Sequence, residues 1–222
     1  MADTDLLAAA YAPLLDLADR LAADGDDDTG WRATALPGWT VRDLLFHLAG
    51  DAQRALVALH TPASDPVDTD AASYWSRWTP GTAGAAAGLR ATRTSASQWS
   101  SVRGPASLYA GTARAVLHAA AAADPEQPVG TQGHVLAVGD LLSTLVVEAA
   151  VHTLDLGEVV PAGPAPAALS EVRRVAEALL GAPVTAAVDD ARLARLVTGR
   201  AAATPAERDG LGDAAGRLPL FG

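Results

Sequence analysis

The sequence contains no cysteine and no lysine, and only 5% of its 222 residues are aromatic. The absence of cysteine excludes disulfide bonds, thiolate metal sites, iron–sulfur clusters and a cysteine nucleophile. All 16 basic residues are arginine, and 26 acidic residues outnumber them to give a net charge of −10. This negative charge argues against binding to nucleic acid, whose phosphates need cationic partners. It also argues against binding to an anionic membrane surface.

Long hydrophobic runs are also missing. No stretch reaches the ~18 consecutive apolar residues that a membrane-spanning helix requires. The first residues, Met1 to Asp5, are acidic, whereas a secretory signal peptide begins with basic residues. We therefore expect a soluble, cytoplasmic protein, and half of its residues are hydrophobic, which suffices for a substantial core.

Helical periodicity dominates what is present. Apolar residues recur at spacings of three and four, and no segment shows the alternation of a strand. Thr40 followed by Asp43 predicts a capping box at the start of one helix. The pattern predicts an all-α fold, a four-helix bundle with a helical tail. The predicted long helices span residues 5–23, 41–60, 84–123 (with a break at Gly104-Pro105) and 139–157, and residues 61–72 and 124–133 form loops.

The composition changes at residues 161–166, where three prolines predict a stiff linker. We therefore divide the chain into a four-helix domain, residues 1–160, and a helical C-terminal extension, residues 161–222. The extension is predicted to contain helices at 167–180 and 189–198. A third helix begins at Thr204-Pro205-Ala206-Glu207, a second capping box.

Polar side chains follow one face of the predicted helix 139–157. Because that helix is apolar on most faces, it should be central and buried. A buried carboxylate is costly unless it is paired, protonated or bound to a metal. The i, i+4 spacing of Glu148 and His152 can offer two ligands to one metal ion, although it also suits a buried ion pair. At 100° per residue, the polar residues in this sector are Thr144, Glu148, His152 and Asp155.

A third metal ligand can come from the predicted helix 41–60. His47 lies at the edge of its apolar face, beside Asp51, and can point between helices. A lone histidine in such a place can also be structural. Two histidines and a carboxylate suit zinc with an open fourth position, and they also suit iron or manganese. The other histidines have no ligand-like neighbours in the sequence: His60, His118 and His134.

Two segments carry a resemblance to a known family. The first is LPGWTVRDLLFHLA at residues 36–49, and the second is VGDLLSTLVVEAAVHTLDL at residues 138–156. In this order they resemble the mycothiol-dependent maleylpyruvate isomerase N-terminal domain family, part of the DinB-like group of four-helix metalloproteins. The resemblance spans residues 5–160 and implies a DinB-like four-helix bundle.

The resemblance implies a divalent metal, usually zinc, held by His47, Glu148 and His152. It also implies that the open position receives the thiol of mycothiol, the low-molecular-weight thiol of actinobacteria. A thiol bound to zinc is deprotonated near neutral pH, and the thiolate is the nucleophile. The expected function is a mycothiol-dependent S-transferase or isomerase acting on a small electrophile. Residues expected to support the ligands or bind substrate are Thr144, Asp155 and Asp51.

Other functions stay open at this point. The bundle could bind a metal or a thiol without catalysis, or the open position could hold water for a metal-dependent hydrolysis. The expected partners are a small electrophile and a low-molecular-weight thiol, and the chain is a monomer or a homodimer. The isomerase that names the family carries a larger C-terminal domain of mixed α/β type than this chain has. Candidates for contact with substrate are Arg77, Arg90, Arg93 and Arg103, and Trp75, Trp78 and Trp99 either line a cleft or pack in the core.

Overall fold

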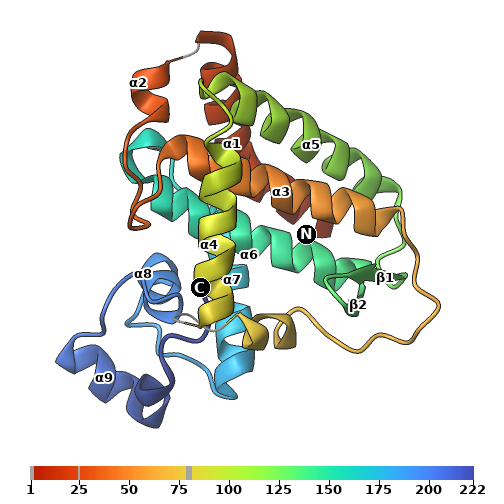
Figure 1. The fold of residues 1–222 in the computed structure, drawn as a ribbon. Coiled ribbons are helices and arrows are strands. Elements are labelled where there is room, and N and C mark those ends of the chain that lie inside the picture. Colours follow the sequence, from red (N-terminus) through yellow and green to blue (C-terminus); the bar gives the residue numbers. More distant parts are fainter. Residues whose placement is uncertain (1–2, 25, 79–81) are drawn as a thin grey trace.

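Four long helices pack around one core in the computed structural model, which describes residues 3–24, 26–78 and 82–222 (Figure 1). Two of the four helices each contact both of the other two, so the four close into a bundle. This arrangement confirms the predicted all-α fold class and its four-helix bundle. The helices are α1 (Asp3–Asp24), α3 (Val41–Leu59), α5 (Arg103–Ala122) and α6 (Val138–Leu156), with α1 and α3 each packed against both α5 and α6.

The start of α3 is fixed by the predicted capping box. The Oγ1 of Thr40 accepts a hydrogen bond from the backbone N–H of Asp43 at 3.3 Å. In return, the carboxylate of Asp43 accepts one from the backbone N–H of Thr40 at 3.0 Å. These bonds satisfy two N–H groups that a helix start leaves without partners. They therefore set the phase with which the later residues of α3 face the core.

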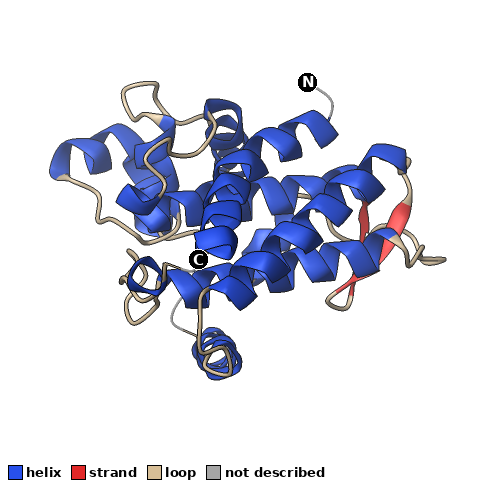
Figure 2. Ribbon diagram, turned by 90° about the horizontal axis from the view of Figure 1, so that it is seen from above, coloured by secondary structure: helices blue, strands red, loops and turns tan. Residues whose placement is uncertain are grey.

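The segment 84–123 is helical with a break, as predicted. The predicted position of that break, Gly104-Pro105, is wrong, and the break divides the segment into two helices. These are α4 (Ala83–Ala96) and α5, separated by residues 97–102. The break precedes the predicted one, since Pro105 lies in the first turn of α5, where a helix needs no N–H donor. Helix α4 packs against α3, is exposed over most of its described surface, and crosses the bundle steeply (Figures 1 and 2).

The prediction of loop over 124–133 and of no strands was also wrong. A short antiparallel hairpin joins α5 to α6, with β1 (Pro128–Thr131) paired to β2 (His134–Ala137). Its two-residue turn has positive φ at both Gln132 (50°) and Gly133 (81°), as a type I′ hairpin turn requires. Four-residue strands are too short for the alternation of apolar residues to become visible in the sequence.

The extension forms helices that pack onto the bundle. Helix α7 (Pro166–Leu180) lies against α6 and α1, and α8 (Asp190–Val197) lies against α7 and α6. Helix α9 (Pro205–Leu211) begins with the predicted Thr204 capping box. The boundary between residues 160 and 161 stays a prediction, although buried residues of the extension join the hydrophobic core of the bundle. The short elements are α2 (Asp27–Gly30), η1 (Ser73–Arg77), η2 (Gly157–Val159) and η3 (Gly212–Arg217).

The three tryptophans singled out in the sequence differ in their surroundings. Trp75 is buried, and its ring packs against Phe221 with a centroid distance of 4.8 Å. Trp78 and Trp99 are exposed at the surface. Trp75 therefore anchors the C-terminus to η1. Among the described residues, no helix has the length and apolarity needed to cross a membrane.

Candidate metal centre

Side chains from α3 and α6 converge at the point where these two helices pack together. His47 extends from α3, and Glu148 and His152 extend from successive turns of α6. The Nε2 atoms of the two histidines lie 3.1 Å apart. The Oε2 of Glu148 lies 3.0 Å from the Nε2 of His152 and 3.8 Å from that of His47. The structure thus brings together the three residues that the sequence predicted as ligands.

The spacing of these three atoms fits a single small cation. Zinc bonds to nitrogen and oxygen at about 2.0–2.2 Å, so ligand atoms on a tetrahedral ion lie roughly 3.3 Å apart. The observed separations, 3.0 to 3.8 Å, bracket that value. The donor set of two imidazoles and one carboxylate is one that zinc, iron and manganese accept. The residues present therefore fit the metal that the resemblance implies.

The orientation of His152 is set by Asp155, one turn further along α6. The Nδ1–H of His152 donates to the Oδ2 of Asp155 at 2.9 Å, which turns Nε2 towards Glu148 and His47. The Asp155 side chain is only 1% exposed. Its carboxylate also receives two hydrogen bonds from Arg200, at 2.7 and 2.8 Å. Asp155 thus lies where the sequence placed it, in contact with a predicted ligand.

Burial and hydrogen bonding shift the pKa values of this group in a consistent direction. Burial by itself lowers the pKa of His152, but the hydrogen bonds and charges of Asp155 and Glu148 outweigh it and raise this pKa to about 9. Burial by itself raises the pKa of Glu148, yet hydrogen bonds from His152 and His47 hold it well below its ordinary value. Without a metal, His152 is therefore protonated at neutral pH, and a metal that binds Nε2 displaces a proton.

Asp51 lies one turn after His47 on α3. Its Oδ2 is 3.3 Å from the Nε2 of His47 and is buried, yet it forms no aligned hydrogen bond with any described residue. Burial and the charge of Glu148 raise the pKa of Asp51. A buried acceptor without a partner is unfavourable unless another group supplies a donor or a cation. The carboxylate of Asp51 is thus a fourth group beside the three donors that can accept a hydrogen bond or bind a cation.

Thr144 occupies the same face of α6, two turns before His152. It is fully buried, and its Oγ1 donates to the carbonyl oxygen of Leu141 at 2.7 Å. That bond lies within α6 and directs the hydroxyl along the helix backbone. The predicted role of Thr144 in supporting the ligands or binding substrate stays a prediction.

Two arginines that the sequence analysis did not select lie near the three donors, each in contact with a neighbouring aspartate. Arg54 on α3 lies 3.7 Å from the Oδ1 of Asp51, and its guanidinium carbon is 5.8 Å from the ring centroid of Tyr74. Arg200 reaches Asp155 from the extension. The spacing of residues 47, 51 and 54 on one helix face could have identified Arg54. Within the described residues, the three donors make no hydrogen bond or ion pair with the four arginines that the sequence analysis selected, Arg77, Arg90, Arg93 and Arg103.

The tight turn that precedes α3 also contacts the cluster. Trp39 is buried and packs edge-on against the ring of His47, with a centroid distance of 5.6 Å. The backbone N–H of Ala35 in the same turn donates to the carbonyl oxygen of Asp155 at 2.9 Å. The segment 36–49 therefore fixes the His47 ring from one side, while α6 fixes its partners.

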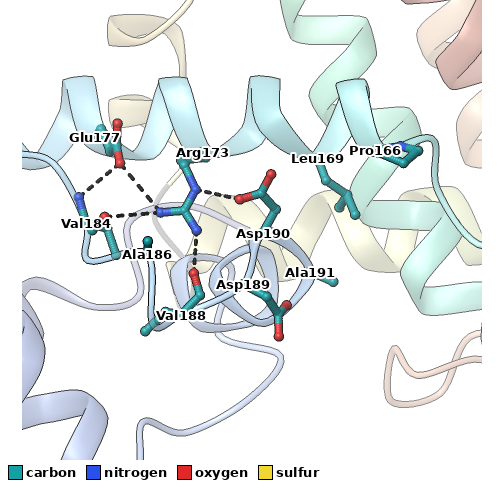
Figure 3. Close-up of a pocket in the computed structure, with 10 residues that line it drawn as sticks. All are labelled: Pro166, Leu169, Arg173, Glu177, Val184, Ala186, Val188, Asp189, Asp190 and Ala191. Carbon is teal, nitrogen blue, oxygen red and sulfur yellow. Dashed lines mark hydrogen bonds and ion pairs between the residues drawn. The ribbon is translucent and has the colours of Figure 1, made fainter.

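A separate groove of about 550 Å³ lies between α7 and the segment leading into α8 (Figure 3). It contains none of the three donors. The guanidinium of Arg173 lies at its centre and donates to Asp190 and to the carbonyl oxygens of Val184 and Val188. Because its N–H groups are engaged within the chain, Arg173 ties the segment to α7 and offers no free charge to a ligand.

The comparisons with known proteins bear on this site directly. The family model described as mycothiol maleylpyruvate isomerase N-terminal domain matches residues 11–157. The match covers more than half of the chain and includes all three donors, and it confirms the resemblance found in the sequence. Comparison with curated proteins and with solved structures gave no match. The chain therefore belongs to the mycothiol maleylpyruvate isomerase N-terminal domain family.

Proposed function

We propose that this protein is a metal-dependent thiol S-transferase or isomerase, in which zinc is held by His47, Glu148 and His152. Mycothiol is the proposed thiol, and a small electrophile is the second substrate. One observation carries the proposal: three donor atoms from two helices converge at 3.0–3.8 Å in a member of this family. Membership of the family supports mycothiol as the thiol, and the geometry of the three donors supports a bound metal.

The groups of the site differ in their exposure to solvent, and two of the three donors are open to a small molecule. The side chains of His47 and Glu148 are 27% and 19% exposed, whereas His152 and Asp155 are almost completely buried. The exposed side is where a cosubstrate can reach the fourth position around the three donors. The buried side holds the hydrogen bonds that keep His152 in place.

The residues have distinct tasks in this chemistry. His47, Glu148 and His152 would hold the divalent ion, and the ion, when bound, would lower the pKa of a thiol at the open position, which would then be a thiolate at neutral pH. Glu148 balances part of the cation's charge, and Asp155 keeps the Nε2 of His152 directed at the site. The Oδ2 of Asp51, which lies 3.3 Å from the Nε2 of His47 without an aligned hydrogen bond, is the proposed acceptor for a hydrogen bond from a cosubstrate. In a transfer, the thiolate sulfur would bond to the electrophilic carbon while the leaving group departs with its bonding electron pair. In an isomerisation, the sulfur would add to an enone, with the carbon–carbon π electrons moving to the carbonyl oxygen, and would be expelled again after rotation about the carbon–carbon single bond.

A second candidate function follows from the position of Asp51. Its Oδ2 lies 3.3 Å from the Nε2 of His47, close enough to become a fourth protein ligand. Zinc sites with four protein ligands are closed and structural, whereas catalytic sites keep one position for a small molecule. In this candidate the bundle binds the metal without turnover.

The experiment that tests the proposal combines metal analysis with a thermal-shift titration of mycothiol. We expect about one divalent metal per chain, and a melting temperature that rises with mycothiol concentration because the thiol binds only the folded protein. His47→Ala should abolish both the metal content and the response to mycothiol. The matched control is His60→Ala, since His60 caps the end of α3 away from the three donors.

A folded wild-type protein without affinity for zinc would overturn the proposal. Metal binding without any response to mycothiol would favour the closed, non-catalytic site instead. Binding of both metal and mycothiol without conjugation of any electrophile in a broad panel would contradict the proposed catalysis. Loss of the mycothiol response in His60→Ala as well would show that the response does not report on the metal centre.

A further inference from the structure

We propose that Arg200, in the C-terminal extension, is a positioning residue of the metal centre and acts on His152 through Asp155. This inference rests on the proposed metal site and extends it to a part of the chain outside the family match, which ends at residue 157. The C-terminal extension thus helps to orient a metal ligand, in addition to covering the bundle.

Arg200 holds Asp155 with both prongs of its guanidinium. Its Nε donates to Oδ1 at 2.7 Å and its Nη2 donates to Oδ2 at 2.8 Å. This two-bond geometry between arginine and a carboxylate is stronger and more specific in direction than a single contact. The side chain of Asp155 is buried and that of Arg200 is only 11% exposed, so solvent screens the pair little. The carboxylate is therefore fixed in rotation as well as in position.

The guanidinium is itself held by the backbone around it. Its third nitrogen, Nη1, donates to the carbonyl oxygen of Thr198 at 3.3 Å. The backbone N–H of Arg200 donates to the carbonyl oxygen of Arg195, at the end of α8, at 2.8 Å. Because α8 packs against α6, Arg200 is carried on a segment attached to the helix that bears Glu148 and His152.

One oxygen of Asp155 connects Arg200 to the metal ligand. Oδ2 accepts both from the Nη2 of Arg200 and from the Nδ1 of His152, at 2.8 and 2.9 Å. The carboxylate cannot turn away from the imidazole without breaking a bond to Arg200. Such outer partners hold the ring of a ligating histidine at the angle that a metal requires, and their loss weakens metal binding. Arg200 thus acts on the direction of the His152 Nε2.

A second ion pair in the extension provides a matched control. Arg192 binds Glu207 with the same two-pronged geometry, Nε to Oε1 at 2.6 Å and Nη2 to Oε2 at 2.8 Å. It also donates to a backbone carbonyl, that of Ala202, as Arg200 does to Thr198. The Arg192 pair joins α8 to α9, and among the described residues Arg192 forms no hydrogen bond with Asp155 or the three donors. It therefore reports what losing an ion pair does to the extension alone.

The test is zinc affinity of the full-length protein, measured by competition with a chromophoric chelator. Zinc alone is the probe, so the result does not depend on mycothiol or on activity. We expect Arg200→Gln to bind zinc about 10- to 100-fold more weakly than wild type, and Arg192→Gln to bind it within about twofold. Arg200→Lys should recover only part of the loss, because lysine cannot donate in two parallel bonds to one carboxylate. In an Asp155→Asn background, Arg200→Gln should cause little further loss.

The outcomes separate this inference from the proposed function. Wild-type zinc affinity in Arg200→Gln, or an equal loss in Arg192→Gln, overturns the inference and leaves the metal site standing. If wild type binds no zinc, the proposed function fails, and the link is then decided by the ¹⁵N chemical shifts of the His152 imidazole in metal-free protein. Those shifts should change in Arg200→Gln and stay unchanged in Arg192→Gln. Unchanged His152 shifts in Arg200→Gln would overturn the inference.

Discussion

The charge on His152 determines how the metal-free protein responds to pH. Its pKa is raised from 6.5 to about 9 by the hydrogen bonds to Asp155 and Glu148, which outweigh burial. A group whose pKa is higher in the folded state contributes stability that is complete below its unfolded pKa and is lost as the pH rises through the folded one. We therefore expect the metal-free protein to lose stability between about pH 6.5 and 9, measured by urea unfolding at a series of pH values.

Zinc affinity should change in the opposite direction over the same range. Because the metal displaces the proton from Nε2, binding becomes tighter as the pH rises towards 9.

The control for the dependence of stability on pH is His152→Gln. This variant cannot carry the proton, so the stability of its metal-free form should change less with pH. An equally steep loss of stability in this variant would contradict the assignment to His152.

The ligand residues could be predicted from the sequence because they repeat along helices. Glu148 and His152 are four residues apart in an apolar helix, and that spacing alone places them on one face. His47 required only that a second amphipathic helix present its edge to the first. Arg200 could not be predicted in this way, since its contact with Asp155 crosses 45 residues and depends on how the extension folds back.

At the scale of elements, α2 packs closely against the residue that precedes α5, and this contact leads to a prediction about stability. A Cβ added to Gly30 would lie 2.5 Å from the Cβ of Val102, which is buried and attached directly to the backbone. We expect Gly30→Ala to lower the free energy of unfolding by about 1–3 kcal/mol, because the two segments must separate. Chemical denaturation with matched m-values measures this change.

Gly111, in the middle of α5, is the control for this substitution. A Cβ there would meet nothing within 4 Å, and the position is exposed. Gly111→Ala should raise the free energy of unfolding by about 0.5–1 kcal/mol, because alanine favours the helix. Equal effects of both substitutions would contradict the packing of α2 against α5.

The helix boundaries were largely predictable, whereas the connections between helices were not. The capping boxes at Thr40 and Thr204 are local patterns of four residues, so the sequence contains all the information that places them. The separation of α4 from α5 is not local in this sense. Residues 84–123 are rich in alanine throughout, and Val102 ends the break by packing into the core beside Gly30. The hairpin depends likewise on its place between α5 and α6.

At the scale of the whole molecule, the bundle and the extension meet at the metal centre. Asp155 receives hydrogen bonds from the segment before α3, from α6 and from the extension. The chain contains no cysteine, so the thiol in the proposed chemistry cannot come from the protein itself. Sulfur chemistry, on this account, uses a thiol that arrives as a cosubstrate and meets two histidines and a glutamate.

The most direct test of this account is zinc K-edge X-ray absorption of the zinc-loaded protein, with and without mycothiol. Without the thiol, the first shell should contain only nitrogen and oxygen at about 2.0–2.2 Å, including two imidazoles. Mycothiol should add one sulfur at about 2.3 Å, since no protein residue in the cluster can supply sulfur. A shell that stays free of sulfur at saturating mycothiol would contradict the open coordination position, and with it the proposed thiol chemistry.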